Sequence, residues 1–294
     1  MIRIPALLGD YPVTAALRRG EIASDRVALD FADVTPPSKA FKRTVRELAF
    51  DFSELAITTF LQARAYGKPL ALLPAVVMQR PQYPFLVYNR ARGALDPRGL
   101  AGKRIGIRSY AVTTTVWLRG VLAADHGVDP ASVRWVTFEE PHLAEYREPD
   151  TCERAPAGRT PVDMLLDGEL DAAILADAKL PDERLARLFA DPAAEDAAWR
   201  ARHDGAMMIN HMVVVTERLA GEHPDAVREL WRMLKDARAR AGLPVGGAAD
   251  PNPYGAAANR RNLEIAIDFA AGQGLLPRPL TVDELYHDVT RDLE

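Results

Sequence analysis

Apolar residues recur along the chain with two different spacings, and the succession of these spacings predicts an α/β fold. Short continuous or alternating apolar runs predict strands at 2–8, 27–34, 70–78 and 85–90. Runs with helical spacing lie between them, at 13–22, 36–48 and 57–67. Strands that alternate with helices are typical of layered α/β domains.

The same succession restarts near residue 100 and predicts a second α/β unit. Strands are expected at 100–107, 133–138, 171–176 and 207–220, and helices at 114–128, 161–170 and 182–205. An irregular polar loop is expected over 139–160, and two amphipathic helices over 222–242 and 259–274 flank a Gly/Ala/Pro-rich loop at 243–255. The order of these elements predicts two lobes that flank a ligand cleft, with ligand groups at the carboxyl ends of strands.

Charge and hydropathy argue against nucleic-acid-binding and membrane-spanning classes of protein. The formal net charge is −4, and acidic and basic residues are interspersed, so neither nucleic acid nor an anionic membrane is an expected partner. The first apolar run is broken by Pro5 and Gly9 and lacks the features of a signal peptide, so a cytoplasmic location is expected. No apolar run reaches membrane-spanning length. The sequence leaves the oligomeric state open and is compatible with a homo-oligomer.

Motifs for metals and common cofactors are missing from the sequence. Cys152 is the one cysteine, which excludes an internal disulfide and a thiolate cluster; its polar surroundings predict an inert, exposed thiol. The chain carries no HExxH or CxxC motif, no P-loop and no nucleophile elbow. We therefore expect no metal and no cofactor.

Polar residues that follow the predicted strands are the candidate site. They are Asp10, Tyr11, Ser53, Glu54, Arg80, Tyr110, Thr113, Thr114, Thr115, Asp177, Asn210 and His211. The start of a helix offers unpaired backbone amides and the positive end of the helix dipole, and three consecutive threonines add hydroxyl donors there. These residues therefore predict an oxyanion cradle, meaning a site that binds a carboxylate or phenolate oxygen. Tyr110, just before them, adds a phenol. Helix capping would explain one threonine but not three.

The remaining candidates each have a structural alternative. His211 begins an apolar strand and could carry protons, or simply bond to a carbonyl at a strand edge. Arg80 ends a buried run and could hold a substrate carboxylate, or form a salt bridge between lobes. Glu54 is expected to open a helix, either as a partner of His211 or a substrate hydroxyl, or as a capping residue.

Several segments together resemble the 4,5-dihydroxyphthalate decarboxylase family, a branch of the type 2 periplasmic-binding-protein fold. They are FDFSELAITTFLQARAYG (50–67), GKRIGIRSYAVTTTVWLRGVLAADHGVD (102–129), GRTPVDMLLDGELDAAI (158–174), INHMVVV (209–215) and NPYGAAANRRNLEIAIDFAAGQGL (252–275). The resemblance implies a first lobe of residues 1–88 and 208–294, a second lobe of 89–207, and a cleft between them that holds the substrate. Tyr254, within NPYG, becomes a candidate wall of that cleft.

The resemblance also implies an activity. This is cofactor-independent decarboxylation of a hydroxylated aromatic acid in aromatic catabolism, with His211 moving the proton and Arg80 and the threonines holding carboxylate and phenolate. Such family members usually carry Arg-x-Phe-Arg-His where this chain reads RPQYP at 80–84, so Arg80 is retained while a second arginine and a histidine are not. Specificity for a phthalate-type diacid is therefore left open.

Two other functions remain open at the level of sequence. The same fold serves as the substrate-binding protein of ABC-type importers for small organic anions, which would require export. Another cytosolic enzyme on this fold, such as a lyase-like step of futalosine-type menaquinone synthesis, is the third alternative.

Overall fold

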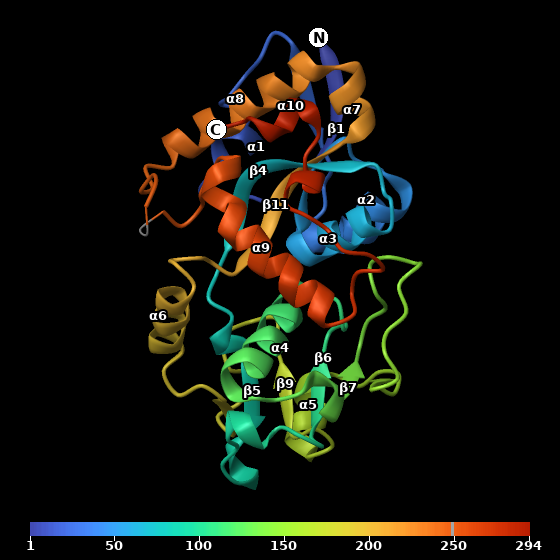
Figure 1. Cartoon of the computed structure of the whole chain (residues 1–294), viewed down its shortest axis with the longest axis vertical. Helices are drawn as coiled ribbons and strands as arrows, with labels where there is room; N and C mark the ends of the chain where they lie inside the picture. Colours follow the sequence, from blue (N-terminus) through green and yellow to red (C-terminus); the bar gives the residue numbers. More distant parts are fainter. Residues whose placement is uncertain (248–249) are drawn as a thin grey trace. The chain divides into compact units, whose positions relative to one another are not determined.

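The computed structural model describes residues 1–247 and 250–294, and the chain divides into two compact units. Unit 1 comprises Met1–Arg80, His142–Ala144 and Ile209–Glu294, and unit 2 comprises Pro81–Pro141 and Glu145–Met208 (Figure 1). Residues 81–88 thus fall in unit 2, whereas the sequence assigned them to the first lobe. The reason is that the strand containing residues 86–89 pairs within the sheet of unit 2.

Unit 1 is built on a five-stranded sheet with the order β2-β1-β3-β11-β4. The strands are β1 (Ile2–Leu7), β2 (Val27–Phe31), β3 (Phe52–Ala56), β4 (Leu70–Gln79) and β11 (Ile209–Thr216). β1 runs parallel to β2 and β3, while β11 runs antiparallel to β3 and β4. The predicted strand at 70–78 is confirmed: the first eight residues of β4 are all buried, as expected for a strand inside a covered sheet.

Helices pack on the sheet of unit 1. They are α1 (Ala15–Arg18), α2 (Phe41–Glu47), α3 (Ile57–Ala65), α7 (Glu217–Glu222), α8 (Pro224–Arg240), α9 (Ala256–Gly272) and α10 (Asp288–Arg291), with short 3-10 turns at Pro37–Ala40 and Asp283–Leu285. α8 contacts α1, α7 and α10, and α3 contacts α9 (Figure 1). Val213 and Val215 of β11 join Trp231 and Leu234 of α8 in one core cluster, so the expected amphipathic helix buries its apolar face here.

Unit 2 is built on a six-stranded sheet with the order β10-β5-β9-β6-β7-β8. The strands are β5 (Leu86–Asn89), β6 (Arg104–Ile107), β7 (Arg134–Thr137), β8 (Cys152–Arg154), β9 (Ala172–Ile174) and β10 (Leu185–Arg187). β6 runs parallel to β7 and β9, and β7 runs parallel to β8. The carboxyl ends of these parallel strands therefore lie at a common edge.

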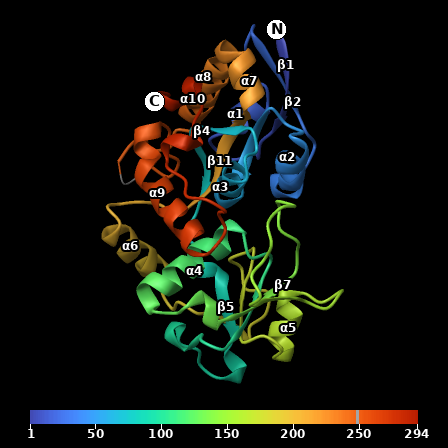
Figure 2. The same ribbon diagram turned by 45° about the vertical axis from the view of Figure 1, so that its right-hand side comes forward.

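Three helices belong to unit 2. They are α4 (Thr113–His126), α5 (Pro161–Asp167) and α6 (Pro192–Arg202), with 3-10 turns at Tyr83–Phe85, Arg90–Arg92, Pro97–Gly99 and Pro130–Ser132. Figure 2 shows α4 and α5 beside the strands of this unit. Gly127 ends α4 in the left-handed conformation, φ 66°, which explains why the predicted helix stops there.

Two predicted elements were wrong in part. Residues 185–187 lie in strand β10 rather than in a helix, and residues 152–154 of the predicted loop form β8. Both strands are three residues long, which is too short for an alternation of apolar and polar residues to predict them. Residues 248–249 of the predicted loop at 243–255 lie outside the described residues. Within the described ranges, no helix combines the length and hydropathy needed to cross a bilayer.

Candidate active site in unit 1

The candidate residues of unit 1 converge on one edge of its sheet. Tyr11 follows the carboxyl end of β1, Glu54 is the middle residue of β3, and Arg80 follows the carboxyl end of β4. His211 lies near the amino end of β11, which runs antiparallel and so starts at this same edge. Open α/β sheets bind ligands at such an edge.

Glu54 lies in a strand, so the expectation that it opens a helix was wrong. It is the third residue of β3, its exposed fraction is 0%, and α3 begins only at Ile57. β3 pairs with β11 in a register that sets Glu54 opposite Val213 and His211 opposite Ala56. Glu54 and His211 are therefore diagonal neighbours on one face of the sheet, within reach of each other.

The buried Glu54 carboxylate is bonded by three groups from different segments. Its Oε1 accepts from the Tyr11 hydroxyl at 2.9 Å and lies 2.8 Å from Nδ1 of His211. Its Oε2 accepts from the backbone N–H of Gly9. Because burying a carboxylate is costly unless it is bonded, these contacts are what allow Glu54 to remain inside the unit.

The turn after β1 is shaped to bring the Tyr11 hydroxyl to Glu54. A Cβ at position 9 would lie 2.5 Å from ring atoms of Tyr11, so only glycine lets the ring fold back over the turn. The buried Thr14 closes the turn, because its hydroxyl donates to the Gly9 carbonyl at 2.6 Å and accepts from the Tyr11 N–H at 3.0 Å.

The imidazole of His211 is held in one orientation. A carboxylate oxygen accepts hydrogen bonds, so the contact with Glu54 assigns the hydrogen to Nδ1 and directs Nε2 away from the carboxylate. The edge of Phe41 packs on the ring, with centroids 5.2 Å apart and planes at 78°. The His211 side chain is 12% exposed, so it is shielded but still reachable. This arrangement of carboxylate, imidazole and open nitrogen is that of a general acid/base pair.

Tyr11 lies in an environment that keeps its phenol protonated. Burial, followed by the charge of Glu54 and the hydrogen bond to it, raises the pKa of Tyr11 above the ordinary tyrosine range. The positive charge of Arg80 acts in the opposite direction on the same pKa. Tyr11 therefore remains a hydrogen-bond donor at neutral pH.

A pH dependence of stability follows from the raised pKa of Tyr11. The folded state favours the neutral phenol, so its contribution is present below the ordinary pKa of about 10 and is lost as the pH rises beyond it. We expect the free energy of unfolding to fall above about pH 10 less steeply in Tyr11→Phe than in the unchanged protein. Urea unfolding between about pH 8 and 11 measures both slopes. Equal slopes would show that Tyr11 is not perturbed.

His142 and its neighbours were missed at the level of sequence. His142 is buried, and its Nδ1 lies 2.8 Å from the Thr59 hydroxyl. Phe41 packs edge-on against His142 as well as His211, with centroids 5.9 Å apart. The Arg46 guanidinium donates to the His142 carbonyl at 2.7 Å. Only three residues of this segment, His142–Ala144, belong to unit 1. So short a segment has no apolar spacing from which its burial could be predicted.

The other predicted site residues of unit 1 are Ser53, Asn210, Asp10 and Tyr254. Ser53 is adjacent to Glu54 in β3 and so points to the opposite face; its hydroxyl donates to the Glu54 carbonyl at 2.7 Å. Asn210 is buried beside His211 in β11, and Asp10 is exposed in the turn after β1. Tyr254 packs against Trp231 with ring centroids 5.5 Å apart. Their roles in binding stay predictions.

In unit 2, the predicted helix start is confirmed, and its three threonines are buried. α4 begins at Thr113, and the residue before it, Val112, offers no side-chain cap. The predicted role of Thr113 to Thr115 as an oxyanion cradle stays a prediction. Tyr110 is 4% exposed, and the buried Arg119 guanidinium lies 3.4 Å over its ring; its predicted contribution of a phenol to the site stays a prediction.

Asp177 and Cys152 also lie in unit 2. The Asp177 carboxylate accepts from the backbone N–H of Lys179 at 2.9 Å, as in a local turn. Cys152 is partly buried rather than exposed, and burial raises the pKa of its thiol to about 12, which fits the predicted lack of reactivity. Within the part of the chain that the structure describes, no group of three or more His, Cys, Asp or Glu side chains is arranged to hold a metal ion.

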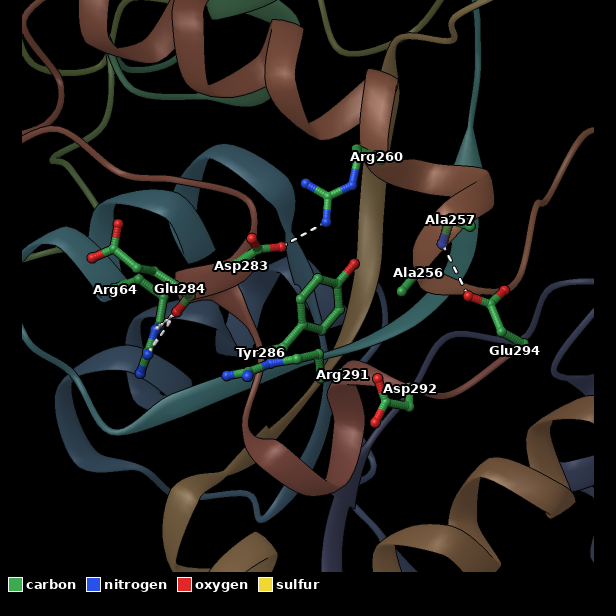
Figure 3. Close-up of a pocket in the computed structure, with 10 residues that line it drawn as sticks. All are labelled: Arg64, Ala256, Ala257, Arg260, Asp283, Glu284, Tyr286, Arg291, Asp292 and Glu294. Atoms are coloured by element: carbon green, nitrogen blue, oxygen red, sulfur yellow. Dashed lines mark hydrogen bonds and ion pairs between the residues drawn. The ribbon is translucent and has the colours of Figure 1, made fainter.

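A surface pocket of about 620 Å³ in unit 1 lies at the start of α9 and is lined by other residues (Figure 3). Three of its charged side chains are bonded within the pocket. Arg260 donates to Asp283 at 2.6 Å, and the Glu294 carboxylate accepts from the Ala257 N–H at 3.1 Å.

The fold places the protein in the class of periplasmic-binding-protein-like α/β proteins. The chain aligns with the alkanesulfonate-binding protein SsuA from Xanthomonas axonopodis pv. citri, solved bound to MOPS, at a TM-score of 0.59. The match covers 97% of this chain and 98% of that one, at 15% identity. At this level of identity, the similarity concerns the fold alone. The chain matches no family model.

Two curated proteins are similar in sequence, and both are named 4,5-dihydroxyphthalate decarboxylase. The one from Comamonas testosteroni is 31% identical over 252 residues, which is 82% of this chain and 76% of that protein. The one from Pseudomonas putida is 30% identical over 181 residues, 59% of this chain and 70% of that protein. The chain belongs to the 4,5-dihydroxyphthalate decarboxylase family.

Proposed function

We propose that the protein is a carboxy-lyase that removes CO2 from a hydroxylated aromatic carboxylic acid at the carboxyl edge of unit 1. The observation that carries the proposal is the buried Glu54 carboxylate, joined to His211 and Tyr11 at the end of the sheet where Arg80 follows β4. Membership of the decarboxylase family supports the reaction class.

The chemistry requires a proton donor, an anion holder and a shielded environment. The bond between the ring carbon and the carboxylate breaks, its electron pair stays on the carbon, and a proton takes the place of CO2. His211 supplies this proton from Nε2, while Glu54 stabilises the imidazolium through Nδ1. An ionised ring hydroxyl pushes electron density toward the same carbon, and the phenol of Tyr11 is placed to hold Glu54 in position during the cycle.

Arg80 is assigned to the substrate carboxylate. Its planar guanidinium matches a carboxylate with two parallel hydrogen bonds, whereas lysine offers a point charge. We expect Arg80→Ala to raise KM about tenfold to a hundredfold with a smaller effect on kcat, because a hydrogen bond to a charged group contributes about 1.5–3 kcal/mol. Arg80→Lys should recover part of the affinity. Unchanged KM values in steady-state kinetics of Arg80→Ala would remove Arg80 from the site.

Turnover tests the proposed function directly. Purified protein is incubated with dihydroxybenzoates and hydroxyphthalates, and CO2 release is followed together with loss of the aromatic acid. The proposal predicts one CO2 per acid consumed, without an added cofactor. Tight binding of an acid without any CO2 release would instead favour a solute-binding protein.

A further inference from the structure

One buried aromatic ring in unit 1 contacts two imidazoles. Phe41, the first residue of α2, is 1% exposed. Its ring centroid lies 5.2 Å from that of His211 and 5.9 Å from that of His142. Both contacts are edge-to-face, with angles of 78° and 85° between the ring planes, and aromatic rings attract one another in this geometry. Phe41 therefore links the proposed proton donor to a second histidine.

His142 is bonded to two helices at once. Its Nδ1 lies 2.8 Å from the hydroxyl of Thr59 in α3, and its backbone carbonyl accepts from the Arg46 guanidinium in α2 at 2.7 Å. His142 and Thr59 are both buried, so the loss of their contact would leave a buried polar atom without a hydrogen bond. Arg46 and Phe41 belong to the same helix. His142 thus connects α2, which carries Phe41, to α3.

The side-chain contact of His142 differs in charge from that of His211. His211 lies 2.8 Å from a carboxylate oxygen of Glu54, and a carboxylate stabilises an imidazolium. The hydroxyl of Thr59 carries no net charge, so it orients the His142 ring without supplying that stabilisation. The contact with Thr59 therefore suits His142 to holding a neighbouring ring in place.

We propose that His142 is a positioning residue that acts on His211 through Phe41. The bond to Thr59 fixes the His142 ring, and that ring limits the position of Phe41. The edge of Phe41 in turn keeps the His211 imidazole against Glu54. All of these residues belong to unit 1. The inference rests on the proposed function, because it adds a residue to the proposed proton-transfer site.

Steady-state kinetics of two variants test this role. His142→Ala removes the ring, whereas Thr59→Val removes only the hydroxyl and keeps the shape of the side chain. The substrate is whichever of 4,5-dihydroxyphthalate and 3,4-dihydroxybenzoate the protein turns over. We expect kcat to fall about tenfold to hundredfold in His142→Ala and by less in Thr59→Val, because a displaced proton donor disturbs the reacting geometry. KM should change by less than about threefold, since substrate binding is assigned elsewhere. His142→Asn, whose amide can reach the Thr59 hydroxyl, should recover part of kcat.

A double-mutant cycle tests the route through Phe41. Phe41→Leu keeps an apolar side chain and removes the flat ring edge, so it should lower kcat as well. If His142 acts through Phe41, adding His142→Ala to Phe41→Leu should lower kcat by less than about twofold further, because residues in one chain of contacts have non-additive effects. Fully additive losses would overturn the inference.

The nitrogen NMR shifts of the His211 ring give a readout that does not depend on turnover. A ring held with its hydrogen on Nδ1, opposite Glu54, shows two well-separated nitrogen shifts, and their separation shrinks when the tautomers exchange. The separation should shrink in His142→Ala and in Thr59→Val. His126→Ala is the matched control, because His126 packs against Phe189 in unit 2 with centroids 5.4 Å apart. It should leave kcat, KM and the His211 shifts unchanged.

The outcomes distinguish this inference from the proposed function. Unchanged kcat in both His142→Ala and Thr59→Val, or unchanged His211 shifts in both, would overturn the inference even if decarboxylation is confirmed. If neither acid is turned over, the proposed function fails, and the nitrogen shifts alone decide whether His142 positions His211.

Discussion

Replacing His211 with alanine should lower kcat about 10²- to 10⁴-fold, the range typical for loss of a positioned proton donor. KM should change little, because the carboxylate of the substrate is assigned to Arg80. The ring is fixed by Glu54 at 2.8 Å and by the edge of Phe41, so it is oriented before substrate binds. Steady-state kinetics on a confirmed substrate measure both constants.

Two further measurements separate catalysis from folding in this variant. Added imidazole should restore part of the activity of His211→Ala, which a collapsed site would not allow. His223→Ala, at the junction of α7 and α8, should retain full kcat and serves as the matched histidine control. A His211→Ala protein with full activity would refute the proton-transfer role.

Replacing Glu54 with alanine should destabilise unit 1 as well as abolish turnover. The change leaves the Tyr11 hydroxyl, His211 Nδ1 and the Gly9 N–H without their acceptor. Breaking a buried ionic contact costs about 3–5 kcal/mol, so the free energy of unfolding should fall by about that amount. Denaturant unfolding of both proteins measures the difference.

Glu54→Gln separates the two effects. The amide keeps an acceptor oxygen, so the stability loss should be smaller, about 1–2 kcal/mol, while kcat still falls at least about 100-fold because a neutral amide cannot stabilise the imidazolium. Asp51→Asn is the control for stability alone, since Asp51 is a carboxylate bonded to Thr216 and Arg218 at 2.7 Å each. A Glu54→Gln protein with normal kcat would show that the carboxylate serves the fold only.

The helices and strands whose apolar residues follow a clear spacing were predicted from the sequence. β4 is a continuous apolar run, α8 has one apolar face, and α4 ends at a glycine that adopts a left-handed conformation. The pairing of Glu54 with His211 was anticipated as an alternative and is present at 2.8 Å. These features are local, or lie at strand ends that the α/β layout brings to one edge.

The features that were missed depend on long-range packing. Glu54 was expected in a helix because its charge beside Ser53 resembles a helix start, but pairing with β11 placed it in β3. His142 lies in a segment without regular spacing and is defined by its contacts with Thr59 and Arg46.

A crystal structure of the protein with a non-reactive hydroxylated aromatic acid tests the central claim most directly. The account predicts that the carboxylate of the bound acid contacts Arg80 and that a ring carbon or hydroxyl lies within hydrogen-bond reach of Nε2 of His211. An acid bound instead in the pocket at the start of α9, with the Glu54 edge empty at saturating concentration, would contradict it.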